Sequence, residues 1–203
     1  ADYQEQVKKS YNLIIRGVRE MSRVNFGAKP LMYPQPVLII GTYDENGVPN
    51  AMNAAWGITT DFKEITISLS NHKTTDNLLK RKAFTVSMAT EEQVVPCDYV
   101  GIVSGRKVPD KFARAGFHAS RSEYVDAPLI DELPVAMECK VKSFENGILI
   151  GEIINVSAEE SVITEGKVDI KKLKPISFDP FGNAYYGVGE KLGNAFKDGM
   201  NLK

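Results

Sequence analysis

The segment at residues 70–82, "SNHKTTDNLLKRK", gathers hydrogen-bond donors where an apolar run ends and a helix is predicted to begin. The N–H groups in the first turn of a helix have no partner within the helix, and they bind anions readily. Side-chain donors beside these amides are supplied by His72, Lys73, Thr74 and Thr75. A phosphate monoester carries a charge of about −1.5 to −2 at neutral pH and suits such a set of donors.

A second interpretation of this segment is an ordinary turn from a strand into a helix, with Thr74 or Thr75 as the cap. Asp76 favours this alternative, because an acidic side chain in the first turn satisfies the helix dipole by itself and repels an anion. The residue types alone leave both interpretations open.

A second segment, "NAMNAAWGI" at residues 50–58, combines small side chains with the only tryptophan of the chain. Small residues allow a ligand to approach the backbone closely; here they are Ala51, Ala54, Ala55 and Gly57. Trp56 can then pack against a flat ring system. A tightly packed barrel corner needs the same small residues, so this alternative stays open as well.

Two further segments carry glycines beside polar residues. "GIVSGRKVPDKF" at 101–112 contains two glycines, a serine and several basic residues, and it predicts a polar loop with donors. "GVGEKLG" at 187–193 suggests a dinucleotide fingerprint, but its G-x-G-x-x-x-G spacing is one residue too long, so we reject it. No nucleophile–base motif stands out.

Composition excludes several function classes. The formal net charge is −1, so no global field attracts the chain to nucleic acid or to an acidic membrane surface. No apolar stretch approaches the roughly 20 residues of a membrane span. Cys97 and Cys139 lie far apart and indicate neither a disulfide framework nor a zinc site, and we expect both to be structural. We therefore expect a cytoplasmic protein without metal.

The first 23 residues are predicted to be an extension before the main domain. Helical spacing of Val7, Tyr11, Ile14 and Val18 would suit a docked amphipathic helix. An added extension without a role in the fold is equally consistent with this sequence. Arg16 and Arg19 interrupt the only candidate for a signal peptide.

Strand patterns dominate the rest of the chain. Apolar or alternating runs predict strands at 36–43, 48–58, 64–70, 83–89, 134–145 and 148–160. The pairs Asn46-Gly47 and Asn146-Gly147 predict tight hairpins. Thr90 to Gln93 fits a capping box, with a break expected at Pro96, and Asp110 could cap a short helix that follows.

The sum is a mainly β protein of six or seven hairpin-connected strands with a few short helices. Long strands in a chain of this size predict a closed or nearly closed barrel. The alternating strands and helices of a doubly wound sheet are missing.

Five segments, taken in order, resemble the flavin reductase-like, FMN-binding split-barrel proteins, and within them most closely the flavoredoxins. These segments are "PVLIIGTYDENGVPNAMNAAWG", "SNHKTTDN", "YVGIVSGRKVPDKFARAG", "LPVAMECKV" and "YYGVGEKLG". The resemblance implies a six-stranded Greek-key split barrel over residues 24–203. It also implies a homodimer with one FMN per subunit near the dimer interface.

The resemblance also implies which residues bind FMN. The phosphate and ribityl chain are assigned to Ser70, His72, Lys73, Thr74, Thr75 and Asn77. The isoalloxazine ring is assigned to the backbone of Asn53, Ala54, Ala55 and Trp56. Ser104, Arg106 and Lys111 are expected to reach the ring or the phosphate from a closing loop, and Tyr185 and Tyr186 to lie near the flavin. A cation such as Lys111 or Arg106 beside the ring would raise its reduction potential.

Three functions follow as hypotheses. The first is a reductase that takes hydride from NAD(P)H, and the second is a carrier that moves electrons between protein partners, which the flavoredoxin-like segments favour. The third is a non-enzymatic barrel that binds another flat ligand such as haem.

Overall fold

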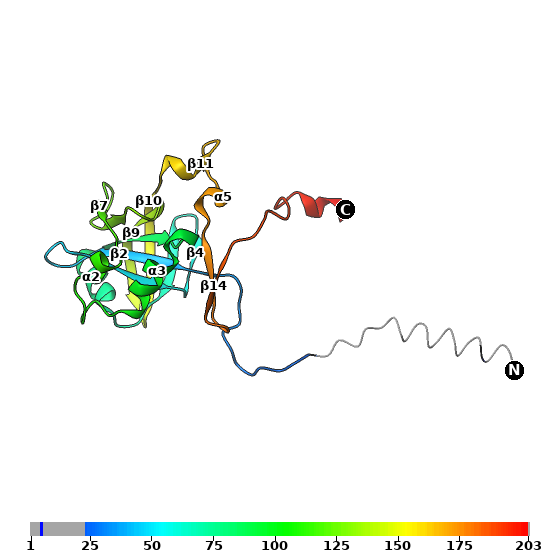
Figure 1. Ribbon diagram of the computed structural model, residues 1–203, viewed down its shortest axis with the longest axis horizontal. Helices are drawn as coiled ribbons and strands as arrows, with labels where there is room; N and C mark the ends of the chain where they lie inside the picture. The colour runs from blue at the N-terminus through cyan, green and yellow to red at the C-terminus, as the bar shows by residue number, and fades with distance from the viewer. Residues whose placement is uncertain (1–4, 6–22, 203) are drawn as a thin grey trace. The chain divides into compact units, whose positions relative to one another are not determined.

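The computed structural model describes Glu5 and residues 23–202 (Figure 1). Contacts divide the chain into Ala1–Pro30 and Leu31–Lys203, and everything described below belongs to the second unit. The helix expected around Val7, Tyr11, Ile14 and Val18 lies outside the described residues.

One antiparallel sheet of seven strands forms the body of this unit, in the order β3-β2-β6-β9-β10-β5-β4. Its strands are β2 (Leu38–Tyr43), β3 (Pro49–Ala54), β4 (Gly57–Asp61), β5 (Glu64–Ser68), β6 (Ala83–Met88), β9 (Val135–Glu145) and β10 (Ile148–Ala158). The mainly β, split-barrel prediction is confirmed. The sheet has one strand more than the six expected, because the predicted strand 48–58 divides into β3 and β4.

The division between β3 and β4 opens the barrel. These two strands are the opposite ends of the sheet, and Ala55 and Trp56 carry the chain from one end to the other. Beside this crossing the backbone N–H of Ser68 donates to the carbonyl of Trp56 at 2.7 Å. The curled sheet therefore has a split, and the segment with small side chains lies at it.

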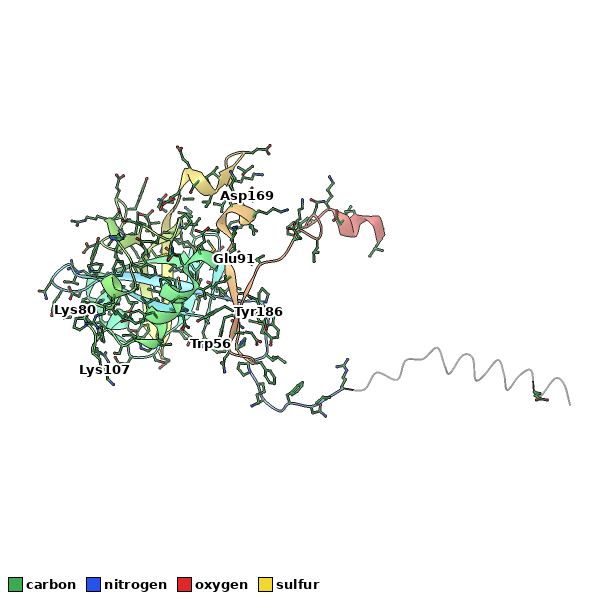
Figure 2. All side chains as sticks on the ribbon, in the orientation of Figure 1. Trp56, Lys80, Glu91, Lys107, Asp169 and Tyr186 are labelled. Carbon is green, nitrogen blue, oxygen red and sulfur yellow. The ribbon has the colours of Figure 1, made fainter. Side chains whose placement is uncertain are left out.

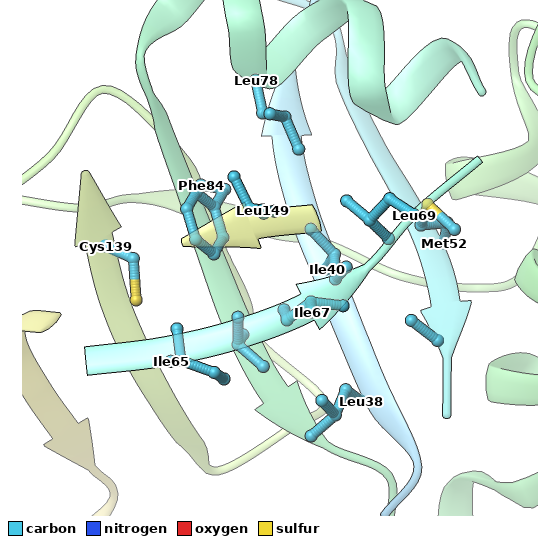
Figure 3. Packing of buried hydrophobic residues seen from close by; sticks show 12 residues of the cluster. Leu38, Ile40, Met52, Ile65, Ile67, Leu69, Leu78, Phe84, Cys139 and Leu149 are labelled. Carbon is cyan, nitrogen blue, oxygen red and sulfur yellow. The ribbon is translucent and has the colours of Figure 1, made fainter. Parts of the chain in front are cut away.

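The barrel core is filled by the inward-facing side chains of these strands (Figure 3). Ile40, Ile67, Phe84 and Leu149 are all fully buried. Each such side chain contributes about 1.5–3 kcal/mol relative to an exposed one. Cys139 lies in the same core, as predicted, and burial raises the pKa of its thiol to about 12.

A second apolar cluster lies between the sheet and two helices, α3 (Val94–Ile102) and α4 (Lys111–Arg114). Strand alternation explains it, because Ile39 points away from the barrel core and packs with Val100 and Phe112. Cys97 is buried here, and burial raises the pKa of its thiol to about 12, so its predicted structural role is consistent with its environment.

Of the predictions made for the helix starts, the break near Pro96 is confirmed and the two side-chain caps are wrong. Thr90 precedes the short 3-10 helix η1 (Glu91–Gln93), but its side chain makes no capping hydrogen bond, so the predicted capping box is wrong. Asp110 does not cap α4 either, because its carboxylate accepts from Arg114 Nε at 2.8 Å instead. The expected break is present: α3 starts at Val94, which places Pro96 in its first turn, where proline is tolerated.

The remaining elements are short. A three-stranded sheet contains β1 (Gln35–Pro36), β13 (Ile176–Asp179) and β14 (Ala184–Gly187). The others are α2 (Lys73–Arg81), β7 (Ala119–Arg121), β8 (Pro128–Ile130), η2 (Glu160–Val162), β11 (Ile163–Thr164), β12 (Lys167–Val168), α5 (Ile170–Leu173) and η3 (Asp198–Leu202). No helix in the described part of the chain is long and apolar enough to cross a membrane.

Candidate functional site

A pocket of about 360 Å³, which we call the slot, lies at the split of the barrel. It is lined by Met52, Asn53, Ala54, Ala55, Trp56, Ser68, Leu69, Ser70, His72, Asp98, Gly101, Ile102, Phe178 and Tyr185. These residues come from the end of β3, the end of β5, the start of α2, α3 and the β13–β14 hairpin. Both segments singled out for an anion and for a flat ring therefore contribute to one pocket.

The slot has an apolar rim. Trp56 is 49% exposed and Ile102 is 74% exposed, which is high for large apolar side chains. Trp56 lies toward β14, the strand that carries Tyr186 (Figure 2). An open slot with apolar walls and accessible backbone suits a flat aromatic ligand.

One wall of the slot carries a chain of hydrogen bonds. Asn53 Nδ2 donates to the carbonyl of Cys97 at 3.2 Å and to the Tyr185 hydroxyl at 3.5 Å. The Tyr185 hydroxyl in turn donates to Asp98 Oδ1 at 2.8 Å. Burial, followed by the Asp98 carboxylate, raises the pKa of Tyr185 to about 12, so its hydroxyl stays a donor at neutral pH.

The start of α2 also borders the slot, through His72. His72 is its N-cap residue, and no side chain caps the helix. The first backbone bond runs from Asp76 N to the His72 carbonyl, so the amides of Lys73, Thr74 and Thr75 precede the helical ladder. Donors of this kind suit an anion, as one of the two interpretations of this segment predicted, and anion binding here stays a prediction.

A second pocket of about 360 Å³, the basic pocket, lies beside this helix start and includes Lys73. It is lined by Asp44, Val48, Pro49, Asn50, Lys73, Gly105, Arg106 and Pro109. Arg106 pairs with Asp76 at 2.7 Å. The acid that argued against anion binding is therefore matched by a cation, whereas no ion pair to Lys73 is found among the described residues.

Several predicted site residues lie outside both pockets. Asn50 Nδ2 donates to Thr74 Oγ1 at 2.7 Å, Thr75 Oγ1 donates to the Ser70 carbonyl at 2.7 Å, and Asn77 Nδ2 donates to Thr42 Oγ1 at 3.1 Å. These buried contacts hold α2 against the sheet. Direct contact of Thr74, Thr75 or Asn77 with a cofactor stays a prediction.

Lys111 points away from the slot as well. Its side chain is buried, and Nζ donates to the carbonyls of Val100 and Val103 at 2.8 and 2.9 Å. Burial lowers the pKa of Lys111 to about 8. The ammonium therefore closes the end of α3, and its predicted contact with a ring or phosphate stays untested.

Only some residues of the predicted closing loop and tyrosine pair line a pocket. The Ser104 hydroxyl accepts from the Arg106 backbone N–H at 3.3 Å and lines neither pocket. Of the two tyrosines, Tyr185 lines the slot, and the more exposed Tyr186 does not.

Sequence reasoning missed Asp98, Phe178 and the glycine at 101. Asp98 and Gly101 lie one helical turn apart on α3, and nothing in the local pattern marks that face as functional. Gly101 is required by close packing, since a Cβ there would lie 2.9 Å from Asn53 Cβ. The sequence analysis noted this glycine only as part of the polar segment "GIVSGRKVPDKF".

Comparison with known proteins assigns the family. The sequence profile of the flavin reductase-like domain matches residues 31–172. The chain belongs to the flavin reductase-like family. Flavin binding and redox chemistry are the class of function that this membership supports.

Solved structures agree with the assignment. A flavoredoxin of Desulfovibrio vulgaris (Miyazaki F) is 39% identical, with a TM-score of 0.84 over 88% of this chain and 100% of that chain. A flavoredoxin from Methanosarcina acetivorans is 27% identical, with a TM-score of 0.82 over 90% of this chain and 100% of that chain. Nitrilotriacetate monooxygenase component B from Bacillus cereus, 18% identical with a TM-score of 0.70 over 85% and 100%, shares the fold.

Proposed function

We propose that this protein binds FMN and uses it to transfer electrons. The observation that carries the proposal is the succession of the slot and the basic pocket along the same three segments. Asn53 and Asn50 belong to β3, His72 and Lys73 to the start of α2, and Gly101 and Gly105 to α3 and the loop after it. A long ligand with a flat apolar end and an anionic end fits such a pair of pockets.

The residues present suit FMN at both ends. The ring would occupy the slot between the apolar rim and the Asn53–Tyr185–Asp98 wall. The phosphate would bind the uncapped amides of α2, with Lys73 and Arg106 supplying charge. FMN would supply the redox chemistry, and the chain's own residues would bind it, orient it and control solvent access.

Within this function we propose an electron carrier of the flavoredoxin type. The likeness to a flavoredoxin over 88% of this chain supports it. An NAD(P)H-dependent flavin reductase is the second candidate, which the exposed rim favours, because Trp56 and Ile102 leave one side of the slot open to a second flat molecule. We further propose a homodimer, as the family resemblance implies.

The first experiment is a visible absorption spectrum of the purified protein, followed by chromatography of the released chromophore. Released FMN supports the proposal. A haem spectrum, or a colourless protein that leaves the fluorescence of added FMN unchanged, contradicts it. Anaerobic addition of NADH and NADPH then separates a reductase, whose flavin is bleached directly, from a carrier, which needs a reduced protein donor.

The phosphate assignment has its own test in the affinity for FMN. We expect Lys73→Ala to weaken FMN binding by about tenfold, since one charge-assisted contact is lost, and the double variant with Thr75→Ala to weaken it further. Lys80→Ala is the matched control, because Lys80 lies on the same helix but pairs with Glu45 at 2.7 Å. Equal affinity of all these variants would refute the assignment.

A further inference from the structure

The formally charged side chains that line the slot are of one sign, negative. Among the described residues that line it, Asp98 is the only carboxylate, and none is a lysine or an arginine. His72 and Tyr185 are the other titratable groups facing it, together with the positive end of α2. The balance of formal charge on the ring side is therefore negative.

The cations that were expected beside the ring are committed elsewhere. Lys111 donates to the carbonyls of Val100 and Val103. Arg106 faces the basic pocket, where it pairs with Asp76 at 2.7 Å. Among the described residues, neither cation forms an ion pair with Asp98 or lines the slot.

The Asp98 carboxylate is held in place without being neutralised. Oδ1 accepts from the Tyr185 hydroxyl at 2.8 Å, and no ion pair of Asp98 is found in the described part of the chain. Tyr185 is fixed in turn by Asn53 Nδ2 at 3.5 Å and by packing on Phe178, whose ring centroid lies 5.9 Å away at an interplanar angle of 48°. A neutral donor orients a carboxylate but leaves its charge in the pocket.

From this arrangement we propose that Asp98, positioned by Tyr185, lowers the reduction potential of the bound flavin. Reduction adds electrons to the ring and makes it more negative, and a fixed negative charge in a partly dehydrated slot disfavours that change. The protein is thereby built as a strong electron donor. The inference rests on the proposed function, because it requires the ring to occupy the slot.

The test is the midpoint potential of the FMN-loaded protein at pH 7, measured anaerobically against reference dyes. We expect Asp98→Asn to shift the equilibrium about tenfold toward the reduced form, which for a two-electron couple is a rise of about 30 mV. Glu92→Gln is the matched control, because it removes the same charge from an exposed position beside the start of α3 that does not line the slot. An unchanged potential in Asp98→Asn, or an equal rise in Glu92→Gln, overturns the proposal.

Tyr185→Phe separates charge from packing. It keeps the carboxylate but removes its donor, so the potential is expected to stay the same or to fall. A rise as large as that of Asp98→Asn would mean that the polar wall acts through structure, and would contradict a role for the charge.

A third measurement needs no flavin. The Asp98 carboxylate is one cause that raises the pKa of Tyr185 to about 12. Ultraviolet titration of the apoprotein, with Tyr185→Phe to assign the transition, is expected to give a lower Tyr185 pKa in Asp98→Asn. No change would show that the pair is not formed in solution.

The two levels of proposal fail differently. A wild-type protein that takes up no FMN contradicts the proposed function and, with it, this inference. If the protein binds FMN but its midpoint potential is the same in wild type and in Asp98→Asn, only the inference is contradicted.

Discussion

Lys111 is a charged side chain with 3% of its surface exposed, and its environment determines when it holds a proton. Burial lowers its pKa from 10.5 to about 8, while the unfolded chain keeps the ordinary value. Between pH 8 and 10.5 the unfolded state therefore binds one proton more than the folded state. Stability contributed through this group rises with pH across that window and is constant below it.

The comparison that isolates this effect is wild type against Lys111→Met. On going from pH 7 to 9.5 we expect the free energy of unfolding of wild type to increase by about 2 kcal/mol relative to the variant. Urea denaturation at the two pH values measures it. Exposed Lys107→Met is the control and should show no such change. A stability difference between wild type and Lys111→Met that is the same at both pH values would contradict the prediction.

Glu138 is a second buried ionisable side chain, 1% exposed on β9, and no ion pair to it is found in the described part of the chain. Ser122 Oγ donates to one carboxylate oxygen, and Asn155 Nδ2 donates to the other at 2.7 Å. Ser122 also accepts from the backbone amides of Tyr124 and Val125 at 3.0 Å, so the carboxylate anchors the segment that covers this face of the sheet.

Removal of this carboxylate is expected to be costly. Glu138→Leu leaves the buried Ser122 hydroxyl and the half-buried Asn155 amide without this partner, and we expect a loss of about 2–4 kcal/mol in the free energy of unfolding. The exposed Glu152→Leu on β10 is the control and should change stability by less than about 0.5 kcal/mol. Chemical denaturation that finds the two variants equally stable would show that the anchor contributes nothing.

At the scale of elements, the position of α3 on β3 determines the width of the slot. Gly101 makes this contact, since a Cβ there would lie 2.9 Å from Asn53 Cβ. The helix and the strand can approach only because this side chain is absent, and Asn53 also bonds the Cys97 carbonyl on the same helix. A larger distance between α3 and β3 would move Asp98, which lies on α3, away from Asn53 on β3.

Gly101→Ala tests this contact. Alanine favours the helix by about 1 kcal/mol, which offsets part of the steric cost, so we expect stability to change by less than about 1 kcal/mol. FMN affinity is nevertheless expected to fall about tenfold, because the slot changes shape. Gly189→Ala, where a Cβ would meet nothing within 4 Å, is the control for binding assays. Unaltered affinity in Gly101→Ala would mean that α3 does not define the slot.

Whole-molecule assembly gives a further prediction. Two chains of 22.4 kDa are expected to sediment as one particle of about twice that mass. Exposed apolar side chains on the edge strand β4 and in the turn after it, Ile58 at 66% and Phe62 at 102%, are consistent with a covered surface in the assembly. Sedimentation equilibrium at micromolar concentration measures the mass, and a monomer with and without FMN would contradict the dimer.

Local signals predicted the parts of the fold that local physics determines. The hairpin of β9 and β10 follows from alternation and from Asn146-Gly147, whose φ angles of 51° and 78° suit the turn. The break between β3 and β4 was not predictable, because the curl of the whole sheet, rather than any residue at 55–56, separates them. Thr90 likewise has a capping sequence without a capping bond.

The candidate site likewise contains residues that a local sequence pattern marks and residues that only the fold brings together. Residues adjacent in sequence, such as Ala54 to Trp56, were singled out because small side chains next to a tryptophan leave room for a flat ligand, and the family resemblance added Asn53. Asp98 and Tyr185 are 87 positions apart and meet only through the packing of the small sheet against α3. Thr74, Thr75 and Asn77 were predicted as ligands, and the sequence did not show their hydrogen bonds to Asn50, the Ser70 carbonyl and Thr42.

The split barrel also gives this protein an internal optical reporter. The chain has one tryptophan, and Trp56 lies at the crossing between the two ends of the sheet, on the rim of the slot. Indole emission overlaps flavin absorption, so a ring in the slot would quench it by energy transfer. Occupancy, exchange and the arrival of a partner at this opening can therefore be followed in the unlabelled protein, one signal per subunit.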